Sequence, residues 1–122
     1  RQLLTTTTEL LGSPAGAVYL RQQQSGVYGL VATLGPVPPL SELSAGCPVV
    51  VQVERGAVLS STSLPPVRRQ LMFLGAEIAQ GLTHEGQLIG LILLAPRPGD
   101  PYSAEEVNRL SAFAQLTALA LS

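Results

Sequence analysis

The feature that most restricts the fold of this chain is the run Leu88–Leu94, LIGLILL. Every position carries an apolar side chain except Gly90, which has none. Because successive residues of a strand point to opposite faces, such a strand needs a cover on both faces of its sheet. The run is far shorter than the about 20 residues of a membrane-spanning helix. It therefore predicts the middle strand of a sheet with packed layers above and below it.

The composition predicts one packed domain and excludes several functions. The chain has 122 residues, of which 46% are hydrophobic and 12% charged, with a net charge of −1. Disordered chains show the opposite balance. There is no lysine, and Arg68–Arg69 is the only basic pair. Binding of nucleic acid draws most of its affinity from Lys and Arg against phosphates, so it is not expected. The missing lysine also excludes Schiff-base and P-loop chemistry.

Cysteine usage and the ends of the chain suggest its context. Cys47 is the only cysteine, so no intramolecular disulfide can form, as is usual in a reducing, cytoplasmic compartment. The sequence starts at Arg1 without a signal-peptide pattern, and both ends read as helices. We expect residues 1–122 to be a single domain cut from a longer protein.

The first 34 residues predict a helix and a β-hairpin. Leucine pairs at 3–4 and 10–11 recur after seven residues, which is typical of a helix that packs along one face against a partner helix. Gly12–Ser13–Pro14 ends this helix. Residues 15–21 and 27–34 then predict two strands joined by a polar loop.

The middle of the chain, residues 35–74, reads as a loop-rich insert. Six prolines interrupt it and prevent any long regular element. Residues 49–61 predict one or two short strands, and residues 65–75 predict a short helix that proline opens and Gly75 closes. A long insert of this kind in a small domain is more often functional than idle.

The last third is more regular. Residues 76–83 predict a strand, and Glu85–Gly86 predicts the turn that leads into the apolar run. Ser103 and Glu106 form a capping box that opens the last helix. The apolar residues of this helix form two adjacent lines along its axis. Together the two lines cover an arc of roughly 200° of the helix surface, about twice the arc that one contact with a core needs. The lines are Val107, Leu110, Ala114, Thr117 and Leu121, then Phe113, Leu116 and Ala120. We expect one line to pack on the sheet and the other on a partner.

The order of these segments resembles a GAF domain. In that family a Gly-x-Glu strand, an apolar central strand and a Tyr-Ser-x-Glu helix opening follow one another, as do residues 75–77, 88–94 and 102–105 here. The segment AGAVYL, residues 15–20, is similar to the family's first strand. One departure is Gly81, where many relatives carry proline. The resemblance implies an α+β, profilin-like fold. Its central antiparallel sheet of five or six strands would carry both terminal helices on one face and a loop-rich cover on the other.

The resemblance also implies a function. GAF domains are sensory modules of signal-transduction proteins such as bacterial two-component histidine kinases. The domain itself is therefore not expected to be an enzyme, whatever the full-length protein does.

Three activities known in the family do not fit these residues. Relatives that attach bilin use a cysteine commonly next to a histidine, whereas Cys47 precedes proline and the only histidine is His84. The cyclic-nucleotide signature needs lysine and asparagine, and the one asparagine is Asn108 in the last helix. One cysteine cannot perform the thiol exchange of methionine-sulfoxide reduction.

Other candidate residues have simpler interpretations. His84 has Glu85 as its only neighbouring ligand, too few for a metal site. Glu105–Glu106 in the first turn of a helix complement its macrodipole. Arg68–Arg69 near a helix start could hold an anion, or could be a solvated pair. Met72 and Phe73 could wall a pocket or pack in the core. We therefore predict no catalytic, cofactor-binding or metal residues and no cofactor.

Three functional hypotheses follow. In the first, an unidentified small molecule binds between the sheet and the insert, and the terminal helices transmit its presence. In the second, the domain is a dimerisation and relay element without a ligand. In the third, it is a roadblock or profilin-like adaptor. For the first two we expect a parallel homodimer, with Leu3, Leu10, Leu110 and Phe113 nearest the seam, which Phe113→Glu would separate.

Overall fold

A computed structural model describes residues 5, 8–9, 11–36, 38–99 and 101–121 of the chain. Six strands form one antiparallel sheet in the order β3-β2-β1-β6-β5-β4. The elements are β1 (Gly16–Arg21), β2 (Tyr28–Leu34), β3 (Glu42–Leu43), α2 (Pro48–Val53), β4 (Val58–Leu59), the short helix η1 (Ser60–Thr62), α3 (Pro65–Phe73), β5 (Ile78–His84), β6 (Gln87–Leu94) and α4 (Ala104–Leu121). Because β6 pairs with both β1 and β5, the prediction that the apolar run is a central strand is confirmed.

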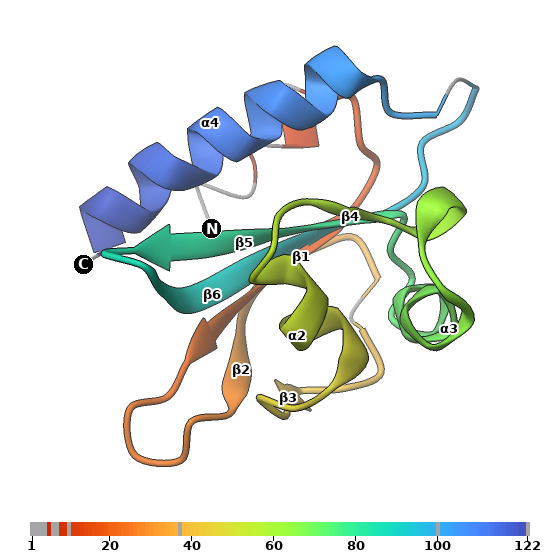
Figure 1. The fold of residues 1–122 in the computed structure, drawn as a ribbon. Coiled ribbons are helices and arrows are strands. Elements are labelled where there is room, and N and C mark those ends of the chain that lie inside the picture. Colours follow the sequence, from red (N-terminus) through yellow and green to blue (C-terminus); the bar gives the residue numbers. More distant parts are fainter. Residues whose placement is uncertain (1–4, 6–7, 10, 37, 100, 122) are drawn as a thin grey trace.

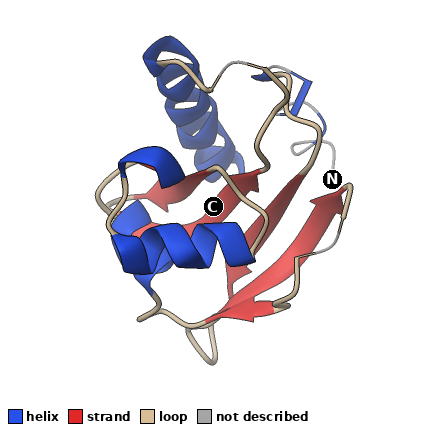
Figure 2. Cartoon of the chain, turned by 90° about the vertical axis from the view of Figure 1, so that its right-hand side faces the viewer, coloured by secondary structure: helices blue, strands red, loops and turns tan. Residues whose placement is uncertain are grey.

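Helices cover both faces of the sheet. Figure 1 shows α4 along one face and α2 and α3 on the other, and Figure 2 shows the same layers after a quarter turn. Alternate residues of β6 divide between the two layers, since Leu91 and Leu93 pack with α2 and α3, while Ile92 and Leu94 pack with α4. The predicted α+β architecture, a sheet of five or six strands with a cover on each face, is confirmed, and the sheet has six strands.

Gly90 allows β6 to pair closely with β1. A Cβ atom at this position would lie 2.5 Å from the carbonyl oxygen of Tyr19 and 2.7 Å from a methyl group of Leu20. The first of these neighbours is backbone and cannot rotate away. The one gap in the apolar run is therefore the position where the strand pairing leaves no room for a side chain.

The strand prediction is wrong for part of the insert. Val58–Leu59 does form β4, but Pro48–Val53 forms the helix α2. Proline in the first turn starts the helix, and the spacing of Val49, Val50 and Val53 places all three valines on its sheet-facing side, where they are buried. Packing on the sheet thus outweighs the strand preference of these β-branched residues.

Local sequence signals set the other element ends. Glu85 and Gly86 both have positive φ, 51° and 78°, as the two-residue turn of the β5–β6 hairpin requires. Gly75, with φ 73°, follows α3 in the left-handed conformation that commonly ends a helix. The predicted capping box opens α4, because Ser103 N–H donates to Glu106 at 2.9 Å and Glu106 N–H donates to Ser103 Oγ at 3.2 Å.

The described part of the N-terminal segment lies on the α4 side of the sheet. Thr5, Thr8, Glu9 and Leu11 are helical, and Leu11 is buried in the same cluster as Leu110. This agrees with the expectation that both terminal helices share one face. Leu3 and Leu10 lie outside the described residues. Among the described helices, none has the length and apolar character needed to cross a bilayer.

Candidate functional site

Directly under α2, one part of the region between the sheet and the insert where we expected a ligand is filled by the chain's own side chains. Val49, Val50 and Val53 of α2 are buried directly against the sheet. The sheet side of this cluster includes Tyr19, Leu91 and their neighbours on β5 and β6. Gly81 lets α2 come close, since a Cβ there would lie 3.0 Å from the carbonyl oxygen of Val53. A ligand in this interior would have to displace packed valines.

The two buried phenols of this interior are engaged in hydrogen bonds. Tyr19 Oη donates to the carbonyl of Leu40 at 2.7 Å, and Tyr28 Oη donates to that of Leu88 at 3.3 Å. Burial raises the pKa of Tyr19 to about 12, and it also raises the pKa of Tyr28. Both phenols therefore stay neutral donors. The bond from Tyr19 holds the loop before β3 against β1, so these groups support the cover and are not offered to a ligand.

The residues that the sequence singled out do not come together. Cys47 is half-buried at the start of α2, whereas His84 ends β5, with its Nε2 3.7 Å from a Glu85 carboxylate oxygen. Within the described part of the chain, no three His, Cys, Asp or Glu side chains are grouped as a metal ion would require. Met72 and Phe73 are both exposed, so the interpretation of these two as core residues is wrong, whereas both line a hollow of about 220 Å³, as the alternative interpretation expected.

Arg68 has a structural role. Its Nε donates to the carbonyl of Ser60 at 3.1 Å, and its Nη2 donates to that of Ser63 at 3.0 Å. These bonds fasten η1 to α3. Arg69, the next residue, is exposed. The pair therefore does not form a joint anion site at the start of the helix.

The last helix divides into two faces, as its sequence predicted. Leu110, Ala114 and Ala118 are buried on the sheet beside Ile78 and Leu82 of β5. Ser111 Oγ adds a hydrogen bond of 2.8 Å to the buried amide oxygen of Gln80. Leu110 is therefore part of the chain's own core and has no exposed surface to offer to a second copy, so this part of the seam prediction is wrong.

The second line of the helix forms an exposed apolar patch. Leu116 and Leu119 keep 68% and 63% of their surfaces accessible, Ala112 and Ala120 are exposed beside them, and Phe113 is half-buried at one border. At roughly 100° per residue, Ala112, Leu116 and Leu119 lie on the side of the helix opposite Leu110 and Ala114, and Phe113 and Ala120 lie at one edge of that side. We call these five residues the α4 patch.

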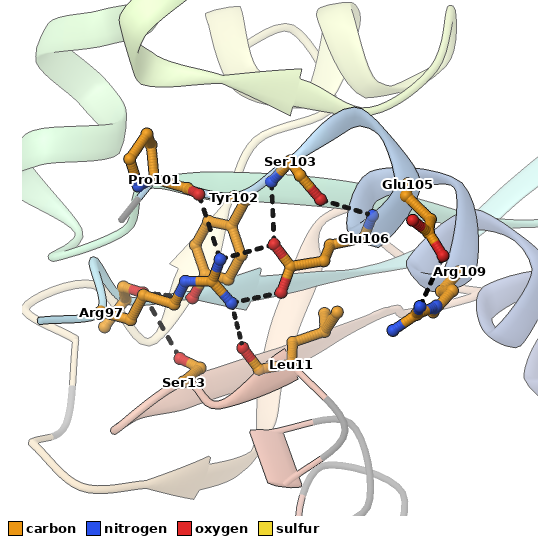
Figure 3. A network of polar contacts seen from close by, with 10 residues as sticks. Leu11, Ser13, Arg97, Pro101, Tyr102, Ser103, Glu105, Glu106 and Arg109 are labelled. Atoms are coloured by element: carbon orange, nitrogen blue, oxygen red, sulfur yellow. Dashed lines mark hydrogen bonds and ion pairs between the residues drawn. The ribbon is translucent and has the colours of Figure 1, made fainter. Parts of the chain in front are cut away.

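Arg97 joins the N-terminal segment to the beginning of α4. Its guanidinium donates to the carbonyl of Leu11 at 2.8 Å and to that of Pro101 at 3.1 Å. It also forms a two-point ion pair with the carboxylate of Glu106, as Figure 3 shows. The guanidinium also stacks 4.8 Å from the ring centre of Tyr102. One side chain thus fixes the end of the first helix relative to the start of the last helix.

Sequence reasoning found half of this network. The capping box identified Ser103 and Glu106, but Arg97 lies in a proline-rich loop that carries no helix periodicity. The signal that could have found it is a lone cation close before a helix whose first turn is acidic, because the helix dipole favours carboxylates there and a carboxylate pairs with a nearby guanidinium.

The Arg97–Glu106 pair predicts a pH dependence of stability. Hydrogen bonds from Arg97, and then from the Ser103 N–H, lower the pKa of Glu106 from 4.5 to about 2. Because the pKa is lower in the folded state, the stabilisation is complete above about pH 4.5 and is lost as pH falls toward 2. The urea midpoint of Glu106→Gln should therefore vary less over this range than that of the unchanged protein.

Glu105→Gln is the matched control for that measurement. Glu105 pairs with Arg109 at 2.6 Å on the exposed surface, where such pairs contribute little. Its removal should leave the pH dependence nearly unchanged. Equal flattening in both variants would show that Glu106 has no special role.

Comparison with known proteins identifies the fold. No protein-family model and no curated protein matches the sequence. Among solved structures, a methyl-accepting chemotaxis protein is similar with a TM-score of 0.77 and 14% identity over 99% of this chain and 85% of that one. The GAF domain/HD domain protein from Geobacter sulfurreducens is similar with a TM-score of 0.73 and 17% identity over 98% of this chain and 87% of that one. The second GAF domain of DevS from Mycobacterium smegmatis is similar with a TM-score of 0.72 and 19% identity over 98% of this chain and 88% of that one.

The chain therefore has the fold of a GAF domain, as the resemblance in its last third predicted. The alignments cover nearly the whole chain, including the loop-rich insert.

Proposed function

We propose that this chain is the regulatory GAF-type module of a longer cytoplasmic signalling protein, and that it dimerises and relays a signal through its terminal helices. The observation that carries the proposal is the α4 patch, with Leu116 and Leu119 largely exposed on the helix face opposite the core. An apolar line of this kind beside a buried line is typical of a helix that packs on its own sheet and on a partner.

The Arg97 network supports the relay. It links Leu11 at the end of the first helix to Glu106 at the start of α4, so that movement of one helix is passed to the other. Packed helix pairs tend to switch between discrete arrangements, which suits a transmitted signal. The similar solved structures include domains of a chemotaxis protein and of DevS, which agrees with a role in signalling.

The filled interior under α2 supports the relay over a ligand held between the sheet and this helix of the insert. The three valines of α2 and the two bonded tyrosines occupy the place where such a ligand would lie. Within the described residues, no metal-ligand cluster is present that would suggest catalysis, and we propose a domain that is not an enzyme.

Disulfide trapping tests both the dimer and its direction. In a Cys47→Ser background, Leu116→Cys should cross-link to a second copy on mild oxidation, whereas Gln115→Cys, one residue aside, should not. Serine suits position 47, because it can cap α2 where Cys47 makes no side-chain capping bond.

Two further variants decide between parallel and antiparallel helices. Ala112 and Ala120 lie one turn before and one turn after Leu116. In the parallel dimer that we propose, Ala112→Cys and Ala120→Cys should each cross-link with itself. In an antiparallel dimer they would couple to each other when mixed. Cross-linking of Gln115→Cys as fast as Leu116→Cys would contradict the proposed interface.

A further inference from the structure

A hollow beside the edge strand β4 borders the filled interior and lies apart from the α4 patch. It encloses about 220 Å³ between the end of α2, β4 and the start of α3. Its lining includes Arg55, Gly56, Val58, Thr62, Leu64 and Val67. At about 30 Å³ per water molecule, the space would hold roughly seven waters, so only a small molecule fits.

The hollow has an apolar side. Val58 and Val67 belong to the core cluster under α2 and α3, and both are buried. Leu64, at the start of α3, is 76% exposed and forms part of the rim. An apolar group placed in the hollow would therefore cover core residues from solvent and gain contact with a leucine that is otherwise in water.

The hollow also has one charged group that is not used by the fold. Arg55 is exposed, and within the described residues its guanidinium has no hydrogen-bond or ion-pair partner. The hydroxyls of Thr62 and Ser63 already donate to the carbonyl of Leu59. Arg68 is outside the lining, and its guanidinium is engaged by the carbonyls of Ser60 and Ser63. The Glu77 carboxylate nearby accepts a bond of 2.7 Å from Ser60 Oγ.

From this arrangement we propose that the hollow binds a small organic carboxylate with an apolar body. The guanidinium of Arg55 holds the carboxylate through its two-donor fork, and the apolar body lies against Val58, Val67 and Leu64. A nucleotide is too large for this volume. The site deepens the proposed function by giving the relay an input, and binding is measured separately from dimerisation so that each can fail alone.

Benzoate is a suitable probe, because it carries one carboxylate on a compact apolar ring. Titrated against the protein, it should shift the amide signals of Val58, Thr62 and Leu64 in a saturable way at millimolar concentration, as expected for so small a ligand. Benzyl alcohol, which lacks the charge, and inorganic phosphate, which lacks the apolar body, should shift these signals at least about tenfold more weakly.

Arg55→Gln tests the charged anchor. It should weaken benzoate binding at least about tenfold, whereas Arg69→Gln, which removes the same charge from a residue outside the lining, should leave it unchanged. Thermal melts of both variants without benzoate should match that of the unchanged protein, since Arg55 holds no other part of the fold.

The outcomes that overturn the proposal are equally definite. They are the absence of saturable shifts with benzoate, equal binding of benzyl alcohol or phosphate, and undiminished binding of benzoate by Arg55→Gln.

Repeating the titration on the Leu116→Glu variant, in which the α4 patch is interrupted, separates the two proposals. Binding that persists there shows that the hollow binds independently of the dimer, and binding that is lost there contradicts a site built from the end of α2, β4 and the start of α3 within one chain.

Discussion

Leu91→Asp is expected to unfold the protein. Leu91 is in the middle of the central strand, is 0% exposed, and packs under α2 in a cluster without a cation to pair with a carboxylate. Burying an unpaired charge costs several kcal/mol, and a small domain is stable by only about 5–15 kcal/mol. Far-ultraviolet circular dichroism and urea titration of the purified variant would measure the loss.

Thr83→Asp is the matched control. Thr83 lies on the neighbouring strand β5, but its side chain is exposed. The same substitution there should change stability by less than about 1 kcal/mol. If Leu91→Asp kept a cooperative transition near that of the control, the description of β6 as covered on both faces would be wrong.

Leu116→Glu is expected to separate the dimer without unfolding the chain. Burying a leucine contributes about 1.5–3 kcal/mol, and the two-fold interface contains it twice. Replacing it by a carboxylate should raise the dissociation constant on the order of a hundredfold or more. Leu116 is a cleaner test than Phe113, because Phe113 is half-buried by its own chain and its replacement would also change contacts within that chain. Sedimentation and thermal melts would measure the two effects.

Gln115→Glu adds the same charge one residue away, at an exposed position outside the α4 patch. It should leave the dissociation constant within about threefold of the original value, since exposed charges are screened. Equal effects of the two variants would mean that general charge repulsion, and no specific contact at Leu116, controls association.

Much of the fold could be predicted because its strongest signals are local or periodic. The apolar run of β6, the capping box of α4 and the Glu85–Gly86 turn each depend on a few consecutive residues. The spacing of apolar residues in α4 also separated the buried line through Leu110 from the line through Leu116. It could not tell which line faces the sheet, because both are apolar.

The insert was harder to predict for a physical reason. Val49, Val50 and Val53 favour a strand by local preference, and only their packing on a finished sheet makes a helix more stable. The filled interior could not be foreseen either, since it depends on Gly81 admitting α2 close to β5. Likewise, Arg97 contacts Leu11 across 86 positions of sequence. The lining of the hollow at Arg55 comes from three elements whose contact depends on that same tertiary packing.

Sedimentation of the unmodified protein over a range of concentrations tests the central claim most directly. We expect a dimer that persists at micromolar concentration, because the α4 patch places Leu116 and Leu119 on an otherwise exposed helix face. The dimer should give way to monomer in the Leu116→Glu variant under the same conditions. An unmodified protein that sediments as a monomer at high micromolar concentration would contradict the proposal that this domain relays its signal through paired terminal helices.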